Sequence, residues 1–259
     1  MKKLLTFSIL TSLFGLQAIS QPTVYKPGEE VRYVIHYGII SAGEVTLELK
    51  EAEYDGKTVW HSKLLGKTTG VADAVFKVLD IYESYMEVET GLPVFTIRNI
   101  REGRYRKYNE VIFDHKTRSD STIITSDLTG MHIAPKGILD IISCFYNFRN
   151  NVLPAKKSSL KEGDIITVMT WFTDELFPVS LKYIKTEEIK TKAGKIKCYK
   201  FNPVTETGRL FKTEEDVSVW FSADGNYLPV KIRFDIFVGA FVVEMTRYNG
   251  TVFPLEIRK

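Results

Sequence analysis

The chain has 259 residues, of which 44% are hydrophobic and 26% are charged, and its 35 Lys and Arg against 32 Asp and Glu give a formal net charge of +3. Residues 1–20 contain Lys2 and Lys3 but no acid, so without them 33 basic side chains face 32 acidic ones. This near-equality of positive and negative charge argues against a polyanion-binding protein, and therefore against nucleic acid as a main partner.

The first 20 residues, MKKLLTFSILTSLFGLQAIS, have the organisation of a secretory signal peptide. Two lysines precede an apolar run that ends at Leu16, and Ala18 and Ser20 are the small residues expected before a cleavage site. The run is too short for a stable membrane span, and no second run of spanning length follows. We therefore expect a soluble periplasmic protein that begins at Gln21 and carries no transmembrane span or lipid.

The segment VRYVIHYGIISAGEVTLEL (31–49) alternates apolar and polar residues on both sides of a glycine-containing connector. This period of two predicts two half-buried strands joined as an antiparallel hairpin. His36 and Ser41 are residue types used in catalysis, but GIISAG is not the G-x-S-x-G motif of a hydrolase nucleophile. We expect a hairpin here and no catalytic loop.

No segment has the spacing of a cofactor, metal or catalytic motif. HSKLLGKTTG (61–70) lacks the first glycine of a phosphate-binding loop, and the four histidines are scattered without metal-ligand spacing. We therefore predict a protein that is not an enzyme and needs no cofactor or metal. A carboxylate pair assembled from distant strands, as in a hydrolase of envelope glycans, stays open as a minor alternative.

An internal repeat organises the chain. FKVLDIYESYMEVETGLPVFTIRNIREGRY (76–105) resembles FKTEEDVSVWFSADGNYLPVKIRFDIFVGAF (211–241), and an offset of 136 places Pro93 on Pro229 and Gly103 on Gly239. The matches predict a duplicated strand meander within one β-rich domain over 21–259. Its parts are repeat one (about 25–118), a helical connector (about 119–160) and repeat two (about 161–250).

Five cations lie within ten residues of a predicted hairpin, in the sequence RNIREGRYRK: Arg98, Arg101, Arg104, Arg106 and Lys107. Guanidinium groups bind carboxylates and phosphates through two hydrogen bonds, so the cluster is a candidate site for an anionic ligand. The alternative is a solvated sheet edge whose charge prevents aggregation.

The connector contains apolar residues at helical spacing, which predicts one amphipathic helix near 137–149. Its apolar face should cover the concave side of the sheet, which makes Ile142, Phe145 and Tyr146 candidate ligand-binding residues. Cys144 and Cys198 are the only cysteines. In an oxidising compartment they either form a disulfide or remain two buried thiols in different elements.

Three segments together resemble an uncharacterised family of exported bacterial proteins, common in Bacteroidota and catalogued as a domain of unknown function. They are YKPGEEVRYVIHYGIISAGEVTLEL, DIYESYMEVETGLPVFTIRNIREGRYRKYNEVIFD and FKTEEDVSVWFSADGNYLPVKIRFDIFVGAFVVEM. This resemblance implies no activity and no site residue. The W-x-S-x-D-x-N-x-x-P-V run in the last segment is also similar to the strand meander of periplasmic lipoprotein carriers, which implies a half-barrel around an apolar cavity.

The sequence therefore predicts a mainly β protein, with an antiparallel curved sheet or open barrel and one amphipathic helix. Its expected function is non-enzymatic binding or carriage of an apolar envelope molecule such as a lipid, with or without an anionic group. The alternative is a structural adaptor that binds another envelope protein. A cavity between helix and sheet favours the carrier, and a filled core with an exposed apolar patch favours the adaptor.

Overall fold

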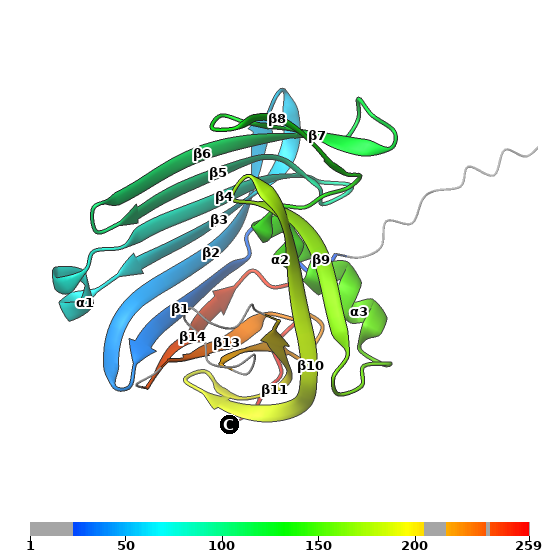
Figure 1. Ribbon diagram of the computed structural model, residues 1–259. Coiled ribbons are helices and arrows are strands. Elements are labelled where there is room, and N and C mark those ends of the chain that lie inside the picture. Colours follow the sequence, from blue (N-terminus) through cyan, green and yellow to red (C-terminus); the bar gives the residue numbers. More distant parts are fainter. Residues whose placement is uncertain (1–22, 205–215, 237–238, 259) are drawn as a thin grey trace, which may run out of the picture.

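The computed structural model describes residues 23–204, 216–236 and 239–258 (Figure 1). In these residues fifteen strands form one sheet, and every pairing of neighbouring strands is antiparallel. The first eight strands are β1 (Glu30–Tyr37), β2 (Ile40–Tyr54), β3 (Lys57–Thr68), β4 (Leu79–Glu87), β5 (Pro93–Glu102), β6 (Tyr105–Asp114), β7 (Ser121–Ser126) and β8 (Gly130–Pro135). The others are β9 (Ile165–Phe172), β10 (Glu175–Thr191), β11 (Gly194–Pro203), β12 (Val217–Ser222), β13 (Pro229–Asp235), β14 (Ala240–Asn249) and β15 (Ile257–Arg258).

The sheet curls into a nearly closed barrel. Its strand order is β8-β7-β6-β5-β4-β3-β2-β1-β14-β13-β12-β11-β10-β9, with β15 paired to β11. The two ends of this path, β8 and β9, are joined through the connector, where Leu139 pairs with Thr170 and accepts a 2.7 Å hydrogen bond from the Trp171 amide. The fold is thus the mainly β, barrel-like sheet that the sequence predicts.

Two runs of six strands, β1–β6 and β9–β14, are each a meander of sequential neighbours. Pro93 is the first residue of β5 and Pro229 the first of β13, which is where a residue without an N–H is tolerated. Gly103 and Gly239 both have positive φ, 54° and 78°, before β6 and β14. The duplication predicts this shared order, and superposition of the two copies stays a prediction. Residues 211–215 and 237–238 of the second copy, and the predicted signal peptide, lie outside the described residues.

One helical segment lies on the concave side of the sheet (Figure 1). It consists of α2 (Ile141–Asn147), the π-helical turn η1 (Phe148–Val152) and α3 (Leu153–Lys156). The helix predicted near 137–149 is present and begins at Ile141, because the Asp140 side chain accepts hydrogen bonds from the amides of Ile142 and Ser143 and caps it. The helix also continues beyond 149, and Pro154, which cannot donate an amide hydrogen bond, is accommodated just after the π turn.

The main hydrophobic core lies between the helix and the sheet. Ile142 and Tyr146 pack there with Leu49 of β2 and Met86 of β4, as the sequence predicts. A second cluster, which includes Trp220 of β12 and Leu255, buries the other side of β12, since Val219 and Phe221 belong to the first cluster. Leu255 belongs to the C-terminal segment, which therefore covers this face of the sheet.

The cysteines do not form a disulfide. Cys144 lies in α2 and Cys198 on β11, and both are buried free thiols. They belong to different parts of the core, because Cys198 is in the Trp220 cluster and its thiol contacts the Ile196 carbonyl at 3.6 Å. This arrangement corresponds to the second of the two alternatives drawn from the sequence.

The 31–49 hairpin forms as predicted, between β1 and β2. The His36 ring contacts the Gly38 carbonyl at 3.1 Å, which is a contact within the β1–β2 turn. A second short helix, α1 (Gly70–Val75), follows β3. Among the described residues, no helix combines the length and apolarity that a membrane span needs.

Candidate ligand-binding site

An apolar cavity of about 300 Å³ lies between the helix and strands β9–β13. Fourteen residues line it, and none has a charged or hydroxyl-bearing side chain. Four come from the helix: Ile141, Cys144, Phe145 and Phe148. Ten come from the sheet: Ile166, Val168, Val179, Leu181, Pro203, Val217, Val219, Phe221, Ile232 and Phe234. Its volume is at the lower end of the range of small-molecule sites.

The cavity exists because the helix has two apolar faces. Ile142, Tyr146 and Arg149, spaced by four and three residues, are buried. The first two pack on the sheet, and Tyr146 accepts a 3.1 Å hydrogen bond from Ser62 of β3. Phe145 and Phe148 belong to the neighbouring face, which lines the cavity. Because one face of the helix packs against β2–β4, the other face points towards β9–β13 and borders the cavity.

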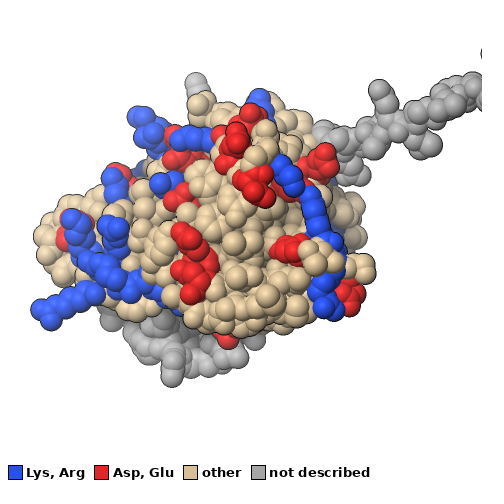
Figure 2. All heavy atoms as spheres, turned by 90° about the horizontal axis from the view of Figure 1, so that it is seen from above, with Lys and Arg blue, Asp and Glu red and all other residues tan. Residues whose placement is uncertain are grey.

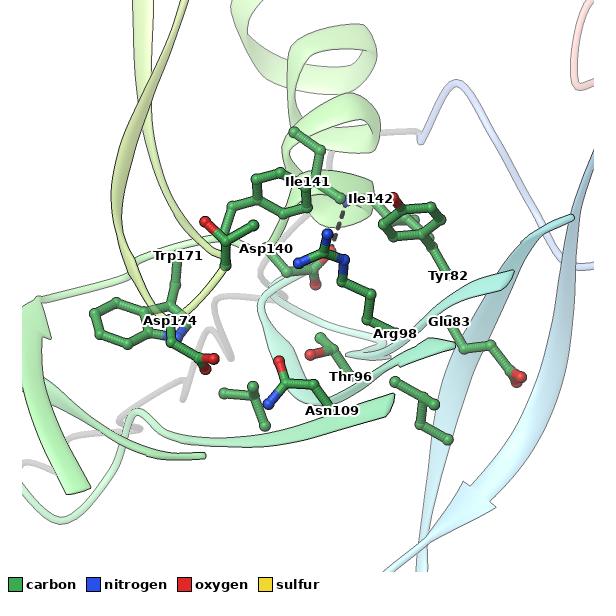
Figure 3. A pocket seen from close by; sticks show the side chains of 14 residues that line it. Tyr82, Glu83, Thr96, Arg98, Asn109, Asp140, Ile141, Ile142, Trp171 and Asp174 are labelled. Atoms are coloured by element: carbon green, nitrogen blue, oxygen red, sulfur yellow. Dashed lines mark hydrogen bonds between the residues drawn. The ribbon is translucent and has the colours of Figure 1, made fainter. Parts of the chain in front are cut away.

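A second, polar cavity of about 40 Å³ adjoins the first, since Ile141 lines both. Figure 3 shows Arg98 directed from β5 towards Asp140 and the start of α2, with Trp171 and Asp174 at another wall. The guanidinium carbon of Arg98 lies 5.1 Å from the centre of the Phe172 ring and 5.9 Å from that of Tyr82. The two rings lie 6.4 Å apart, so Arg98 packs beside the pair and contacts both rings at distances typical of cation–π contacts.

Several polar atoms at this cavity are buried and have no hydrogen-bond partner in the described part of the chain. They are Nε and Nη1 of Arg98, Nε1 of Trp171 and Oδ1 of Asp174. A buried polar group without a partner costs about 1–3 kcal/mol, so four such atoms around one space are a costly arrangement. Three of them are donors, which suits a ligand group rich in acceptor oxygens.

The buried carboxyl group of Asp140 has its own partners. Ser84 of β4 donates to it at 2.5 Å, and the Ile142 and Ser143 amides donate at 2.6 and 3.1 Å. Burial raises the pKa of Asp140 above its usual value, although these hydrogen bonds oppose that effect. Asp140 therefore joins the helix start to β4, and its oxygens are not free to neutralise Arg98.

The turn between β9 and β10 is strained. Thr173 and Asp174 both have positive φ, 55° and 65°, a combination that a two-residue hairpin requires but a β-branched residue rarely adopts. The turn places Phe172 and Asp174 at the polar cavity. Strain of this kind persists where the surrounding structure imposes it, as at ligand sites.

The structure separates the five cations that the sequence groups together. Arg98 lines the polar cavity, whereas Arg101, Arg104 and Arg106 are exposed and Lys107 is half-buried at the outer end of the β5–β6 hairpin. Of the three candidate helix residues, Phe145 lines the apolar cavity, Ile142 lines the polar one and Tyr146 is buried in the core. Sequence reasoning missed Trp171, Asp174 and Asp140, although D-x-x-S at 140–143 is a helix-capping pattern.

The histidines lie apart. His61 contacts Glu83 at 2.7 Å, His115 contacts the Pro93 carbonyl at 2.9 Å, and the His132 ring lies 5.0 Å from that of Trp171. No group of three or more His, Cys, Asp or Glu that could hold a metal ion occurs in the ranges that the structure describes.

One solved structure shares the fold, and a second matches more weakly. A β-barrel-like protein of the domain of unknown function DUF1849 from Brucella abortus matches with a TM-score of 0.58 and 9% identity, over 87% of this chain and 98% of that one. A protein from Bacteroides fragilis with a YmcC-like fold, designated as a candidate exported protein, matches with a TM-score of 0.34 and 10% identity over the same shares. No curated protein matches the sequence. The model of one sequence family covers residues 32–246, and the chain therefore belongs to the family described as protein of unknown function, DUF3108.

Proposed function

We propose that the protein binds and carries an amphipathic molecule of the cell envelope without changing it chemically. The apolar part of the ligand occupies the cavity between the helix and β9–β13, and its anionic head lies at Arg98. The observation that carries this proposal is the entirely apolar lining of the cavity between the helix and β9–β13. A hydrocarbon chain gains about 25 cal/mol per Å² of apolar surface that it buries there.

Both walls of the cavity are held by contacts elsewhere in the fold. On the helix side, Ile142 and Tyr146 fix the opposite face of the helix to the sheet, so the helix cannot move into the space without losing those contacts. On the sheet side, the lining residues belong to paired strands. An apolar cavity with fixed walls stays available for apolar ligands, because collapse would break well-packed contacts elsewhere.

We propose binding without chemistry because the lining of the apolar cavity contains a single side chain that could act as an acid, base or nucleophile. Its one ionisable group is the thiol of Cys144, and burial raises the pKa of that thiol to about 12. The thiolate, which is the reactive form, is therefore almost absent at neutral pH. We further propose that the protein acts in the periplasm after export, with the apolar N-terminal segment as its signal. The cavity favours a carrier over a structural adaptor.

A fluorescent fatty-acid probe tests the proposal. We expect the purified protein to bind it, and Phe145→Trp and Val168→Trp, which add volume from the two sides of the cavity, to weaken binding at least about tenfold while thermal unfolding stays cooperative. Met131→Trp is the matched control, because Met131 lies on β8 with 70% of its surface exposed. Absence of probe binding by the wild type, or equal binding by all four proteins, would refute the carrier.

A further inference from the structure

One end of the barrel exposes large apolar side chains from three neighbouring turns. We call it the apolar end; it consists of Ile39 and Ile40 of the β1–β2 hairpin, Val71 and Val75 of α1, Phe76, and Tyr105 of the β5–β6 hairpin. Their exposure is 103% for Ile39, 81% for Val75 and 73% for Val71, with the other three at 53–54%. Side chains this exposed protrude from the surface.

The three turns touch, so the apolar end is one continuous feature. The Thr69 amide, just before α1, donates to the Ala42 carbonyl of β2 at 3.1 Å. The Gly103 amide of the β5–β6 turn donates to the Lys77 carbonyl at 2.8 Å. The Phe76 ring lies so close to Gly103 that a Cβ there would come within 2.7 Å of it.

The exposure of α1 has no explanation within the fold. The helix has only six residues, none of them buried, and the side chain of Thr69 does not cap it. Helices this short are unstable by themselves and are normally held by burying an apolar face. Here the apolar residues point to solvent, and exposed apolar patches of this kind mark surfaces that bind another protein or a membrane.

Unpaired cations flank the apolar end. Lys77 follows α1, and the segment 101–107, REGRYRK, holds four cations and one acid. Neither Lys77 nor Arg101, Arg104, Arg106 and Lys107 forms an ion pair with any residue that the structure describes. Figure 2 shows Lys and Arg gathered at the left, the side on which Figure 1 places α1 and the tip of the β5–β6 hairpin.

We propose that the apolar end docks the protein on an anionic membrane surface. Protruding apolar and aromatic side chains enter the boundary between head groups and acyl chains, while the flanking cations meet the lipid phosphates. Each Lys or Arg near such a surface adds to the electrostatic attraction. Side chains that project separately from three turns suit a deformable lipid surface better than a preformed groove on a protein.

The proposal does not depend on the carrier function, because none of the six residues lines either cavity. It accounts for the four outer cations of the β5–β6 hairpin, which the ligand site does not use. If both proposals hold, a protein that carries an amphipathic molecule also has a surface for the membrane that supplies or receives it.

Co-sedimentation with vesicles tests the docking. The probes are vesicles of phosphatidylcholine alone and of phosphatidylcholine with phosphatidylglycerol. We expect the full chain to bind the anionic vesicles, less at high salt. Arg104→Glu with Arg106→Glu, and separately Val75→Ser with Phe76→Ser, should each weaken binding at least about tenfold. Every substituted side chain is exposed, so the variants should fold, and thermal unfolding checks this.

Matched controls separate the site from general charge and hydrophobicity. Lys195→Glu with Lys197→Glu reverses two exposed charges on β11, and Met131→Ser removes an exposed apolar side chain on β8. All proteins carry the same N-terminal residues, so the apolar segment 1–20 cannot produce a difference between them. Unchanged controls support the proposal. The proposal would be overturned if the wild-type protein remained in the supernatant after sedimentation with anionic vesicles. It would also be overturned if the controls lost as much vesicle binding as the two test variants.

Discussion

Arg149 and Glu29 form a completely buried ion pair that joins the helix to the residue preceding β1. Two hydrogen bonds of 2.6 and 2.9 Å connect the guanidinium to the two carboxylate oxygens, and the exposure of the side chains is 0% and 2%. Arg149 Nε also donates to the Asn226 carbonyl at 2.9 Å. Burial alone would lower the pKa of Arg149, but Glu29 outweighs it and the pKa is raised. Arg149 therefore stays charged inside the core.

Removing one partner should destabilise the protein strongly. In Arg149→Met the carboxylate of Glu29 stays buried without its counter-charge, and such losses cost about 3–5 kcal/mol. We expect urea unfolding at neutral pH to show that decrease in the free energy of unfolding, with an unchanged dependence on urea concentration.

The double variant Arg149→Met with Glu29→Leu is the control, since replacing both members of a buried pair with apolar residues is often neutral. We expect it to recover most of the stability that the single variant loses. A single variant as stable as the wild type would show that water reaches Glu29.

The two thiols should be inaccessible in the native protein and both reactive after unfolding. Burial raises the pKa of Cys144 and of Cys198 to about 12, so at pH 8 the folded protein contains almost no thiolate. In the unfolded chain the pKa returns to about 8.5 and the thiolate forms readily. We expect Ellman's reagent to label neither cysteine in buffer and both in denaturant without a reductant. Labelling that requires a reductant would indicate a disulfide.

The strands could be predicted from sequence because each depends on local signals. Alternation marks β1 and β2, and proline and glycine mark the ends of strands at Pro93 and Gly103. The contacts that close the barrel, β1 with β14 and Leu139 with Thr170, join residues far apart in the chain. No periodicity encodes such pairs, so sequence alone leaves an open and a nearly closed sheet equally possible.

The candidate site was less predictable for the same reason. Grouping Arg98 with Arg101 follows their closeness in the chain, but residues three apart on a strand face opposite sides. Alternation could therefore have separated them. The role of Trp171 and Asp174 depends on the β9–β10 turn reaching the start of α2, which only the tertiary structure shows. Cys144 and Cys198 could not be assigned because spacing says nothing about distance between elements.

Arg98 should select the head group of the ligand. A hydrogen bond between charged groups contributes about 1.5–3 kcal/mol, so Arg98→Met should weaken binding of a long-chain fatty acid about tenfold to a hundredfold. Binding of the alcohol with the same chain should change little, since its hydroxyl is uncharged. Competition of each compound with the fluorescent probe measures both affinities. Equal losses for acid and alcohol would mean that the substitution disturbs the cavity and that Arg98 does not read the head group.

The same substitution should make the free protein more stable. Nε and Nη1 of Arg98 are buried without a partner in the described structure, and each such donor costs about 1–3 kcal/mol. Methionine fills a similar space beside Tyr82 and Phe172 without those donors, so we expect the free energy of unfolding of Arg98→Met to rise by about 1–2 kcal/mol. Urea unfolding without ligand measures this change. Excess fatty acid should then stabilise the wild type more than the variant, because the stabilisation by a ligand that binds only the folded state grows with the logarithm of its affinity. A variant that is less stable than the wild type in the absence of ligand would show that Arg98 is a structural residue and that its role in binding is wrongly assigned.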